Sequence, residues 1–424
     1  MKKFKTLIIM ALLPMVSQAQ TVTLDECQQL ARENYPLIKQ YDLIQQTTDF
    51  TVSNIMKGWL PQITAAAQAT WQSDVMTLPN PLQNSLKQQG YNVQGLKKDQ
   101  YRVGVELNQI VFDGGLMASQ SRVAKLQGEV QRAQTDVDMY TIRQRVNDMY
   151  FGILLLNEKI QLNQDLQILL QSNLDKLSSL LKNGVAMQSD VNTVKAEKLR
   201  AIQGGTELAA SKKSLVRMLS TFIGKDVSDV TKPAFTVVVN GNNRPELSLF
   251  DKQIQLTNAQ EKALNTRLLP RLSLFAQGGY GYPGYDQFDA MFNHDWKLSG
   301  IIGARLVWNI DGLYKNKTDK KKIQAQRDLI EAGRETFLFN NSLLQIQQSE
   351  GIEKYRKLIN EDDDIVTLRS QVRQSAESKL AHGIIDTNNL LQEITRENQA
   401  KIDRSAHEIQ MLKEAYDLKH TTNK

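Results

Sequence analysis

Few residues of this chain have the types and the spacing that chemistry would need. The four histidines are too far apart in the sequence to show the spacing of metal ligands. They are His294, His382, His407 and His420. No nucleophile elbow and no other catalytic signature is present. The sequence therefore predicts no enzyme, no catalytic residue, no metal site and no cofactor.

Three short motifs suggest ligand binding at first sight, and each has a simpler structural interpretation. Asp113-Gly114-Gly115 lacks the Lys-Ser/Thr pair of a phosphate-binding loop, so it indicates a turn from a strand into a helix. The acidic run Glu361–Asp364 could bind a cation, but it is typical of a solvated helix face or a tunnel wall. The basic cluster Lys315–Lys322 could meet anionic head groups, line a tunnel mouth or face solvent.

The amino terminus has the pattern of a secretory signal peptide. Residues 1–19 combine early lysines, an apolar run from Leu7 to Val16 and the small-x-small sequence Ser17-Gln18-Ala19. No later run approaches the ~18 uncharged apolar residues of a transmembrane helix. The only cysteine is Cys27, so no intrachain disulfide can form. The excess of 52 Lys+Arg over 46 Asp+Glu is small and spread out, which argues against nucleic-acid binding.

The first part of the mature chain predicts a helix followed by a strand pair. A capping box starts the helix at Thr23, and the helical pattern continues to about Trp59 with a kink or restart at Pro36. A β-hairpin is expected at about 61–112, because apolar and polar residues alternate with period two on both sides of a polar loop.

A long helical hairpin is expected next, at about 115–223. No proline interrupts the helical pattern from Leu116 to Leu181, and about 65 helical residues at 1.5 Å each make a rod of ~100 Å. Such a rod must pack along a partner helix. Asn183-Gly184 ends it, and a return helix follows.

The same order of elements recurs in the second half of the chain. The matched positions are Pro36 and Pro245, Pro61 and Pro270, Asp113 and Asp311, and Gly184 and Gly383. Ordered matches on both sides of a loop of different length indicate a duplicated unit. The sequence therefore predicts repeats at 20–243 and 244–424. The second has its β-hairpin at about 270–310 and its long helical hairpin at about 313–418.

The apolar faces of the two β-hairpins favour a membrane over a soluble sheet. A soluble sheet would need a further core, yet the helices are already expected to pair with one another. The strands have the ~9–11 residues that cross a bilayer, and aromatic residues mark the ends of their apolar face, as in an interfacial girdle. The girdle residues are Trp71, Tyr101, Tyr280, Tyr282, Trp296 and Trp308.

Barrel closure then requires several chains. Four strands cannot close a barrel, and an open edge cannot exist in lipid. Two chains would give a filled barrel of eight strands, whereas three would give twelve strands and an open lumen. The sequence thus predicts an α+β membrane protein. In it, duplicated long α-helical hairpins form an α-barrel, and two β-hairpins contribute four strands to a trimeric twelve-stranded transmembrane β-barrel. The alternative is a periplasmic coiled-coil adaptor or scaffold without a pore.

Several short motifs mark the boundaries of these elements. They are Leu24-x-x-Cys27-x-x-Leu30-Ala31-x-x-Asn34, Leu60-Pro61, Leu269-Pro270, Phe112-Asp113-Gly114-Gly115, Ile310-Asp311-Gly312 and the turns Gly184/Asp190 and Gly383/Asn389. Together with the predicted arrangement, these motifs resemble the TolC family of outer-membrane efflux channels. The resemblance implies a homotrimeric exit duct in the outer membrane of a Gram-negative bacterium, extending into the periplasm. The duct would serve a tripartite efflux or type I secretion system and conduct small molecules or polypeptides passively. It would dock with a periplasmic adaptor and an inner-membrane pump.

The resemblance also implies roles for the two helical turns, which would bind the adaptor and close the tunnel. The turn residues expected to dock the adaptor are Leu181, Gly184, Val191, Leu380, Gly383 and Leu390. The family often has acids six and nine positions after the second glycine, where this chain has Asn389 and Gln392. We therefore expect a weaker or displaced acidic gate that includes Asp190 and Asp386. Both aspartates also suit helix N-capping.

Overall fold

The computed structural model describes residues 20–93, 95–236 and 241–423. The predicted signal peptide at 1–19 lies outside these residues. The chain divides into two compact units. Unit 1 contains the residues up to Tyr41, Gln134–Ser248 and the chain from Arg334 onward, and unit 2 contains Asp42–Ala133 and Leu249–Gly333. Each unit therefore combines segments from both halves of the sequence.

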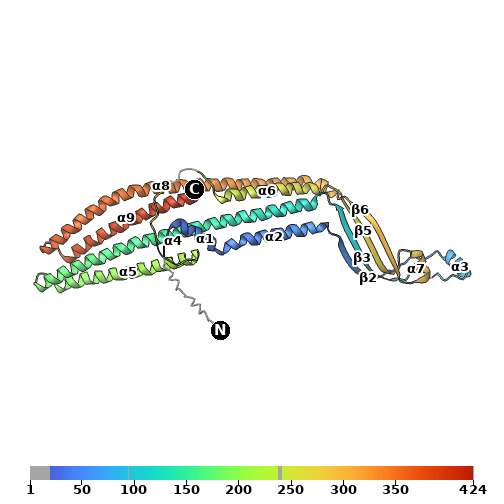
Figure 1. Ribbon diagram of the computed structural model, residues 1–424, viewed down its shortest axis with the longest axis horizontal. Coiled ribbons are helices and arrows are strands. Elements are labelled where there is room, and N and C mark those ends of the chain that lie inside the picture. The colour runs from blue at the N-terminus through green and yellow to red at the C-terminus, as the bar shows by residue number, and fades with distance from the viewer. Residues whose placement is uncertain (1–19, 94, 237–240, 424) are drawn as a thin grey trace, which may run out of the picture. The chain divides into compact units, whose positions relative to one another are not determined.

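Unit 2 contains one antiparallel sheet with the strand order β2-β3-β5-β6 (Figure 1). Its strands are β2 (Gln62–Trp71), β3 (Asp99–Phe112), β5 (Arg271–Tyr282) and β6 (Lys297–Val307). Both predicted hairpins are present, and the pairing of β3 with β5 joins them into a single sheet. Within the described strands, β2 and β6 each pair on one side only.

The strand register puts most of the apolar side chains of the four strands on one face. Leu107 of β3 pairs with Ile63 of β2 and Ala276 of β5, and Ala276 pairs in turn with Ile302 of β6. Paired residues on neighbouring strands point to the same side of a sheet, so the separate period-two patterns combine into one apolar face. Within unit 2 this face is open, since Ile302 is 82% exposed.

A tight turn connects the first hairpin to the long helix α4 (Leu116–Lys182). The buried Asp113 carboxylate accepts hydrogen bonds from the backbone N–H of Gly115 at 2.8 Å and of Met117 at 2.7 Å. Gly114 and Gly115 have φ of +69° and +81°, which favour glycine. The predicted strand-to-helix turn is confirmed, and the aspartate caps the free N–H groups of α4.

Helices of unit 2 are linked by partly exposed ion pairs. The helix α6 (Pro245–Thr266) contacts α4 through Lys252 and Glu129, whose charged atoms are 2.7 Å apart. It contacts α8 (Asp311–Ala381) through Glu261 and Arg327, also at 2.7 Å. Pairs this exposed contribute at most about 1 kcal/mol each. None of the described helices has the length and apolar composition needed to cross a bilayer.

The loops of the two β-hairpins form a small cap with its own core. The predicted loops contain two short helices, α3 (Asn80–Gln88) and α7 (Gln287–Asn293). The buried residues of the cap are Val93, Leu96, Tyr282, Ala290 and Met291. The Tyr282 hydroxyl accepts a hydrogen bond from the Lys97 N–H at 2.8 Å and donates one to the Ala290 carbonyl at 3.2 Å. Since this core forms only where the two loops meet, the local sequence pattern did not predict the helices.

Unit 1 has its main core around the middle of α4. The helices α1 (Leu24–Asn34), α5 (Gln188–Ile223) and α9 (Thr387–Thr422) contribute buried residues to it. A parallel pair of short strands, β1 (Gln20–Val22) and β4 (Val227–Val230), completes it. The Tyr150 hydroxyl lies 2.7 Å from the Thr231 carbonyl and 3.0 Å from that of Val22. Burial raises the pKa of Tyr150 to about 12.

The amino-terminal helix is interrupted at Pro36, as the sequence predicts. A single 3-10 turn, Pro36–Ile38, separates α1 from α2 (Lys39–Met56). The Thr23 side chain accepts a hydrogen bond from the Glu26 N–H at 3.3 Å and so caps α1.

A close helix approach explains Gly205 inside α5. A Cβ atom at Gly205 would lie 2.7 Å from the Asn163 side-chain oxygen on α4. The Asn163 amide donates a hydrogen bond to the Ala201 carbonyl of α5 at 3.0 Å. The absent side chain at Gly205 therefore makes room for a polar contact between the two helices.

Candidate functional site

Two helical turns of unit 1 have nearly identical geometry. Gly184 between α4 and α5 has a φ of +74°, and Gly383 between α8 and α9 has a φ of +69°. In each turn the glycine N–H bonds to a carbonyl three residues earlier at 3.0 Å. The following N–H reaches back five residues at 2.9 Å. These are the hydrogen bonds of a Schellman motif, so the predicted role of both glycines as turn formers is confirmed.

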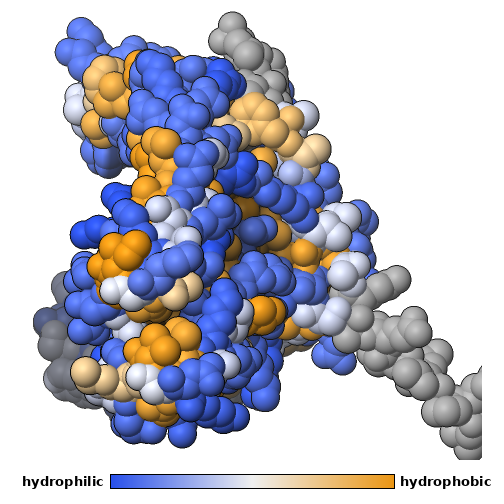
Figure 2. Space-filling model, turned by 90° about the vertical axis from the view of Figure 1, so that its left-hand side faces the viewer, coloured by the Kyte–Doolittle hydropathy of each residue, from blue (hydrophilic) through white to orange (hydrophobic). Residues whose placement is uncertain are grey.

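Exposed apolar side chains follow both glycines. Val185, Met187 and Ile384 are 67%, 72% and 69% exposed. Figure 2 faces the end of unit 1 that carries the turns and shows apolar patches among hydrophilic side chains. All three lie within the predicted tip segments, Asn183–Val191 and His382–Leu390, but the sequence pattern did not single them out. A cluster of this kind is typical of a contact surface.

The predicted docking residues are less exposed than their place beside the turns suggests. Leu390 is fully buried, and it packs in one cluster with the half-buried Val191 and Leu380. Leu181 is half-buried, while Gly184 and Gly383 are exposed. The expectation that Leu390 lies on a docking surface is therefore wrong, because both helical hairpins use this side of α9 as their shared core.

Both predicted gate aspartates cap helices. The Asp386 carboxylate accepts a hydrogen bond from the Asn389 N–H at 2.8 Å and is the N-cap of α9. The Asp190 carboxylate accepts one from the Met187 N–H at 3.0 Å at the start of α5. Asn389 and Gln392 are exposed on the first turns of α9. Each acid thus has a structural role that leaves part of its carboxylate free to face solvent.

Substitution of Asp386 is expected to separate capping from charge. Asparagine caps a helix about as well as aspartate, so Asp386→Asn should leave the thermal unfolding midpoint nearly unchanged. Asp386→Ala should lower the free energy of unfolding by about 1 kcal/mol. Thermal unfolding followed by far-UV circular dichroism checks both variants. Equal destabilisation by the two would argue against a capping role.

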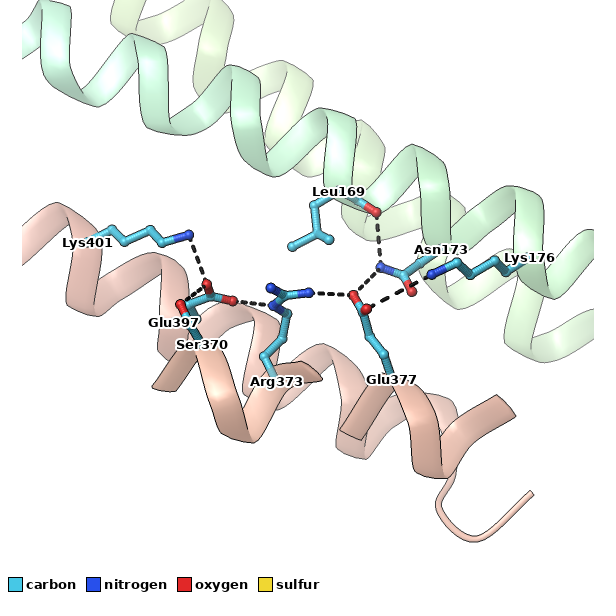
Figure 3. A network of polar contacts seen from close by, with 8 residues as sticks. All are labelled: Leu169, Asn173, Lys176, Ser370, Arg373, Glu377, Glu397 and Lys401. Carbon is cyan, nitrogen blue, oxygen red and sulfur yellow. Dashed lines mark hydrogen bonds and ion pairs between the residues drawn. The ribbon is translucent and has the colours of Figure 1, made fainter. Parts of the chain in front are cut away.

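A buried polar network lies in the same helical hairpins (Figure 3). Glu397 of α9 is 2% exposed and accepts hydrogen bonds from Ser370 at 2.6 Å and from Arg373 of α8. Lys401 lies 2.8 Å from the same carboxylate. Burial alone would raise the pKa of Glu397, but the hydrogen bonds and charges of Lys401, Ser370 and Arg373 outweigh it and hold this pKa below its usual range.

The network continues from α8 to α4 through Glu377. Arg373 pairs with Glu377 at 2.8 Å, and Glu377 accepts a hydrogen bond from the buried Asn173 at 3.5 Å. Lys176 lies 3.9 Å from the other carboxylate oxygen. Figure 3 shows that these side chains converge between the α4 and α8–α9 segments. The network was not predicted from the sequence, although the charged residue Glu397 lies on the apolar stripe of its helix after Ile394, which is a signal for a buried charge.

Most predicted girdle aromatics lie at the ends of the sheet. Trp71, Tyr101, Tyr280 and Trp296 are exposed at the end near the cap, where Trp296 contacts both tyrosines. Trp308 is exposed at the helical end and donates a hydrogen bond to the Leu268 carbonyl at 3.0 Å. Tyr282 differs, because it is buried in the cap core and its hydroxyl has partners there.

The histidines have separate structural contacts. His294 contacts the Gly95 carbonyl at 2.8 Å, and His382 contacts the Ser378 carbonyl at 2.7 Å. His407 contacts Asp362 at 2.6 Å. His420 stacks on a tyrosine ring, and burial together with nearby arginines lowers its pKa to about 3. Among the described residues there is no group of three or more His, Cys, Asp or Glu that could hold a metal ion.

Part of the acidic run on α8 contacts α9. Asp362 is buried beside His407, and Asp363 lies 3.0 Å from Arg404. The expectation of a solvated face is therefore wrong for Asp362, whereas Asp363 is exposed beside its partner. Their partners come from a helix that is distant in the sequence, so no local pattern could show the pairing.

Solved structures share this fold over nearly the whole chain. The outer-membrane channel OprN covers 94% of this chain and 89% of its own, with 15% identity and a TM-score of 0.68. The outer membrane protein VceC from Vibrio cholerae covers 94% and 95%, with 12% identity and a TM-score of 0.67. The Campylobacter jejuni CmeC outer membrane channel covers 94% and 85%, with 12% identity and a TM-score of 0.65.

A family model of outer membrane efflux proteins matches residues 28–225. The match covers slightly less than half of the chain, and over these residues the chain is similar to outer membrane efflux proteins. No curated protein sequence matches it. The fold that the chain shares with these outer-membrane channels comprises the long helices and the two β-hairpins. The resemblance found in the sequence motifs is thereby confirmed.

Proposed function

We propose that the chain is one protomer of a homotrimeric exit duct in the outer membrane of a Gram-negative bacterium. The observation that carries this proposal is the four-stranded sheet of unit 2. One of its faces is apolar and open, and its edge strands β2 and β6 lack a second neighbour in the described strands. In lipid, both edges must be paired, and neighbouring protomers supply the missing strands.

The number of strands favours three protomers. Eight strands from two chains would make a barrel whose interior is filled by side chains, whereas twelve strands from three chains leave an open lumen. The sheet would then place its apolar face toward lipid and its polar face toward the lumen. The long helices would continue the duct as an α-helical tunnel in the periplasm.

The two glycine turns are proposed as the adaptor-docking and gating end. Val185, Met187 and Ile384 offer apolar contact area, and the predicted residues Val191 and Leu380 pack in the hydrophobic cluster of the same helical hairpins. The predicted residue Leu181 is half-buried beside the first turn. The duct would dock there with a periplasmic adaptor and an inner-membrane pump of a tripartite efflux or type I secretion system. It would conduct small molecules or polypeptides passively, so it would be no enzyme.

Asp190 and Asp386 are proposed to form a weak acidic gate with Asn389 and Gln392. Neutralising one ring of carboxylates should reduce the preference of the pore for cations. Single-channel reversal potentials of Asp190→Asn and Asp386→Asn variants in a salt gradient measure this preference. The asparagine at 386 preserves the cap, so a change reports charge. Unchanged cation selectivity in both variants would rule out this gate.

Membrane fractionation and gel mobility distinguish the exit duct from the alternative function, a periplasmic adaptor or scaffold without a pore. We expect the protein in the outer-membrane fraction and a faster-migrating or oligomeric band that changes on boiling, because closed barrels resist detergent. A soluble protein with heat-insensitive mobility would favour the adaptor or scaffold instead.

A further inference from the structure

The polar face of the sheet has an unbalanced charge. The strand register places Arg102, Arg271, Lys297 and Arg305 on this face, opposite the apolar side chains. Glu106 is the only carboxylate of the four strands on it. The apolar face has no lysine or arginine in these strands, and its one acid is Asp99 at the end of β3. The excess of positive charge therefore belongs to one side of the sheet.

Three of these cations have no carboxylate partner in the described structure. The Arg102 guanidinium lies 4.8 Å from the centre of the Tyr285 ring, and the Arg305 guanidinium lies 4.9 Å from that of Phe275. Aromatic faces attract a cation but do not neutralise its charge. Arg271 is exposed at the start of β5. Lys297 is different, because Asp289 of α7 pairs with it.

The free guanidinium groups lie at both ends of the strands. Arg102 pairs in register with Gly281 beside the cap, whereas Arg305 pairs with Ser273 at the helical end. Arg271 also lines a pocket of about 250 Å³ at that end. Arg267, Lys315, Asp311 and Asp319 line the same pocket, and Asp311 pairs with Lys315 at 2.8 Å. Unpaired guanidinium groups thus remain at two levels of the polar face.

We infer that Arg102, Arg271 and Arg305 make the barrel wall selective for anionic solutes. This inference rests on the proposed function, because it needs the polar face to line a lumen. In a closed oligomer every protomer repeats these arginines, so they form two positively charged rings. Rings of arginine or lysine favour anions in pores, and a low-dielectric wall focuses their field into the lumen. The duct would therefore favour cargo with negative charge in its outer-membrane part.

Sided block of the reconstituted full-length protein tests the inference. Sulfated β-cyclodextrin, a bulky polyanion, is added to the side of a planar bilayer that carries the cap, with neutral β-cyclodextrin as the control. We expect the polyanion to block the current and the neutral ring to block it much less. Replacement of the three arginines by glutamine should raise the half-blocking concentration by about tenfold or more, whereas replacement by lysine, which keeps the charge, should retain block.

Ionic strength gives a second measurement on the unaltered protein. Block should weaken as salt rises from about 0.1 M to about 1 M, because the Debye length shortens from about 10 Å to about 3 Å. Any one of three results would overturn the inference: both cyclodextrins block equally, the block does not depend on salt, or the glutamine variant is still blocked. A protein that forms no channel at all would overturn the proposed function instead, so the two failures are distinguishable.

Discussion

Replacing Glu397 with leucine is expected to lower the free energy of unfolding by about 3–5 kcal/mol. The carboxylate is buried and satisfies Arg373, Ser370 and Lys401. Its loss leaves the Arg373 guanidinium, whose side chain is 15% exposed, with Glu377 as its remaining ion-pair partner. Chemical unfolding of the detergent-solubilised protein, followed by far-UV circular dichroism, measures the change.

Two further variants serve as controls for the Glu397 substitution. Combining Glu397→Leu with Arg373→Met removes both buried charges, so much of the lost stability should return. Glu197→Ala breaks an exposed pair with Arg200 and should change stability by less than about 1 kcal/mol. If Glu397→Leu unfolded at the same denaturant concentration as the parent, the network would not stabilise these helices.

The effect of Glu397 also has a definite dependence on pH. Its pKa in the folded protein lies below the ordinary value of 4.5, so the folded state favours the ionised carboxylate. The resulting stabilisation is complete above that ordinary value and is lost as the pH falls through the lowered pKa. The difference in stability between the parent and Glu397→Gln should therefore be largest at neutral pH and shrink in acid. A difference that grew in acid would contradict this sign.

Replacing Ile302 with arginine is expected to prevent insertion into the outer membrane. Ile302 lies near the middle of β6 on the apolar face, where we propose that lipid covers it. An arginine near the bilayer midplane costs about 2–4 kcal/mol, and every protomer of the oligomer would bear that cost. The variant should disappear from the outer-membrane fraction and lose its heat-modifiable band.

The neighbouring residue provides a matched control. Ile301 lies on the same strand at the same depth, but it pairs with Gln277 on the polar face. Ile301→Arg adds the same charge and volume in a lumen-facing position, so the variant should still insert. If both variants inserted equally well, the assignment of one face to lipid would be wrong. If neither inserted, strand β6 would tolerate arginine on neither face.

The sequence predicted local elements better than contacts. Period-two alternation revealed the strands, and long proline-free helical patterns revealed α4 and α8. The turn at Asp113 and the break at Pro36 follow from local backbone chemistry, and the structure shows both. The cap helices α3 and α7 were missed, because their packing depends on residues from two loops that are far apart in the chain.

The side chains at the turns show the same difference between local features, which the sequence predicts, and contacts between distant segments, which it does not. The turn glycines were recognised because a left-handed backbone leaves few alternatives. Leu390 was misplaced, since an apolar residue beside a turn can pack inward or face outward, and only the neighbouring helix decides which. Glu397 and Arg373 were overlooked for a related reason, because their pairing joins two helices.

By itself, the sequence determined the type and order of the elements, the amphipathic character of each strand and the family that the chain resembles. These properties depend on residues that are close together in the sequence, so their propensities and spacing can be read without the tertiary structure. The tertiary structure alone decided that β3 pairs with β5, that the arginines share one face, and that a buried carboxylate joins α8 to α9. Such contacts depend on register and packing between distant segments, and a one-residue shift in register would move every side chain to the other face.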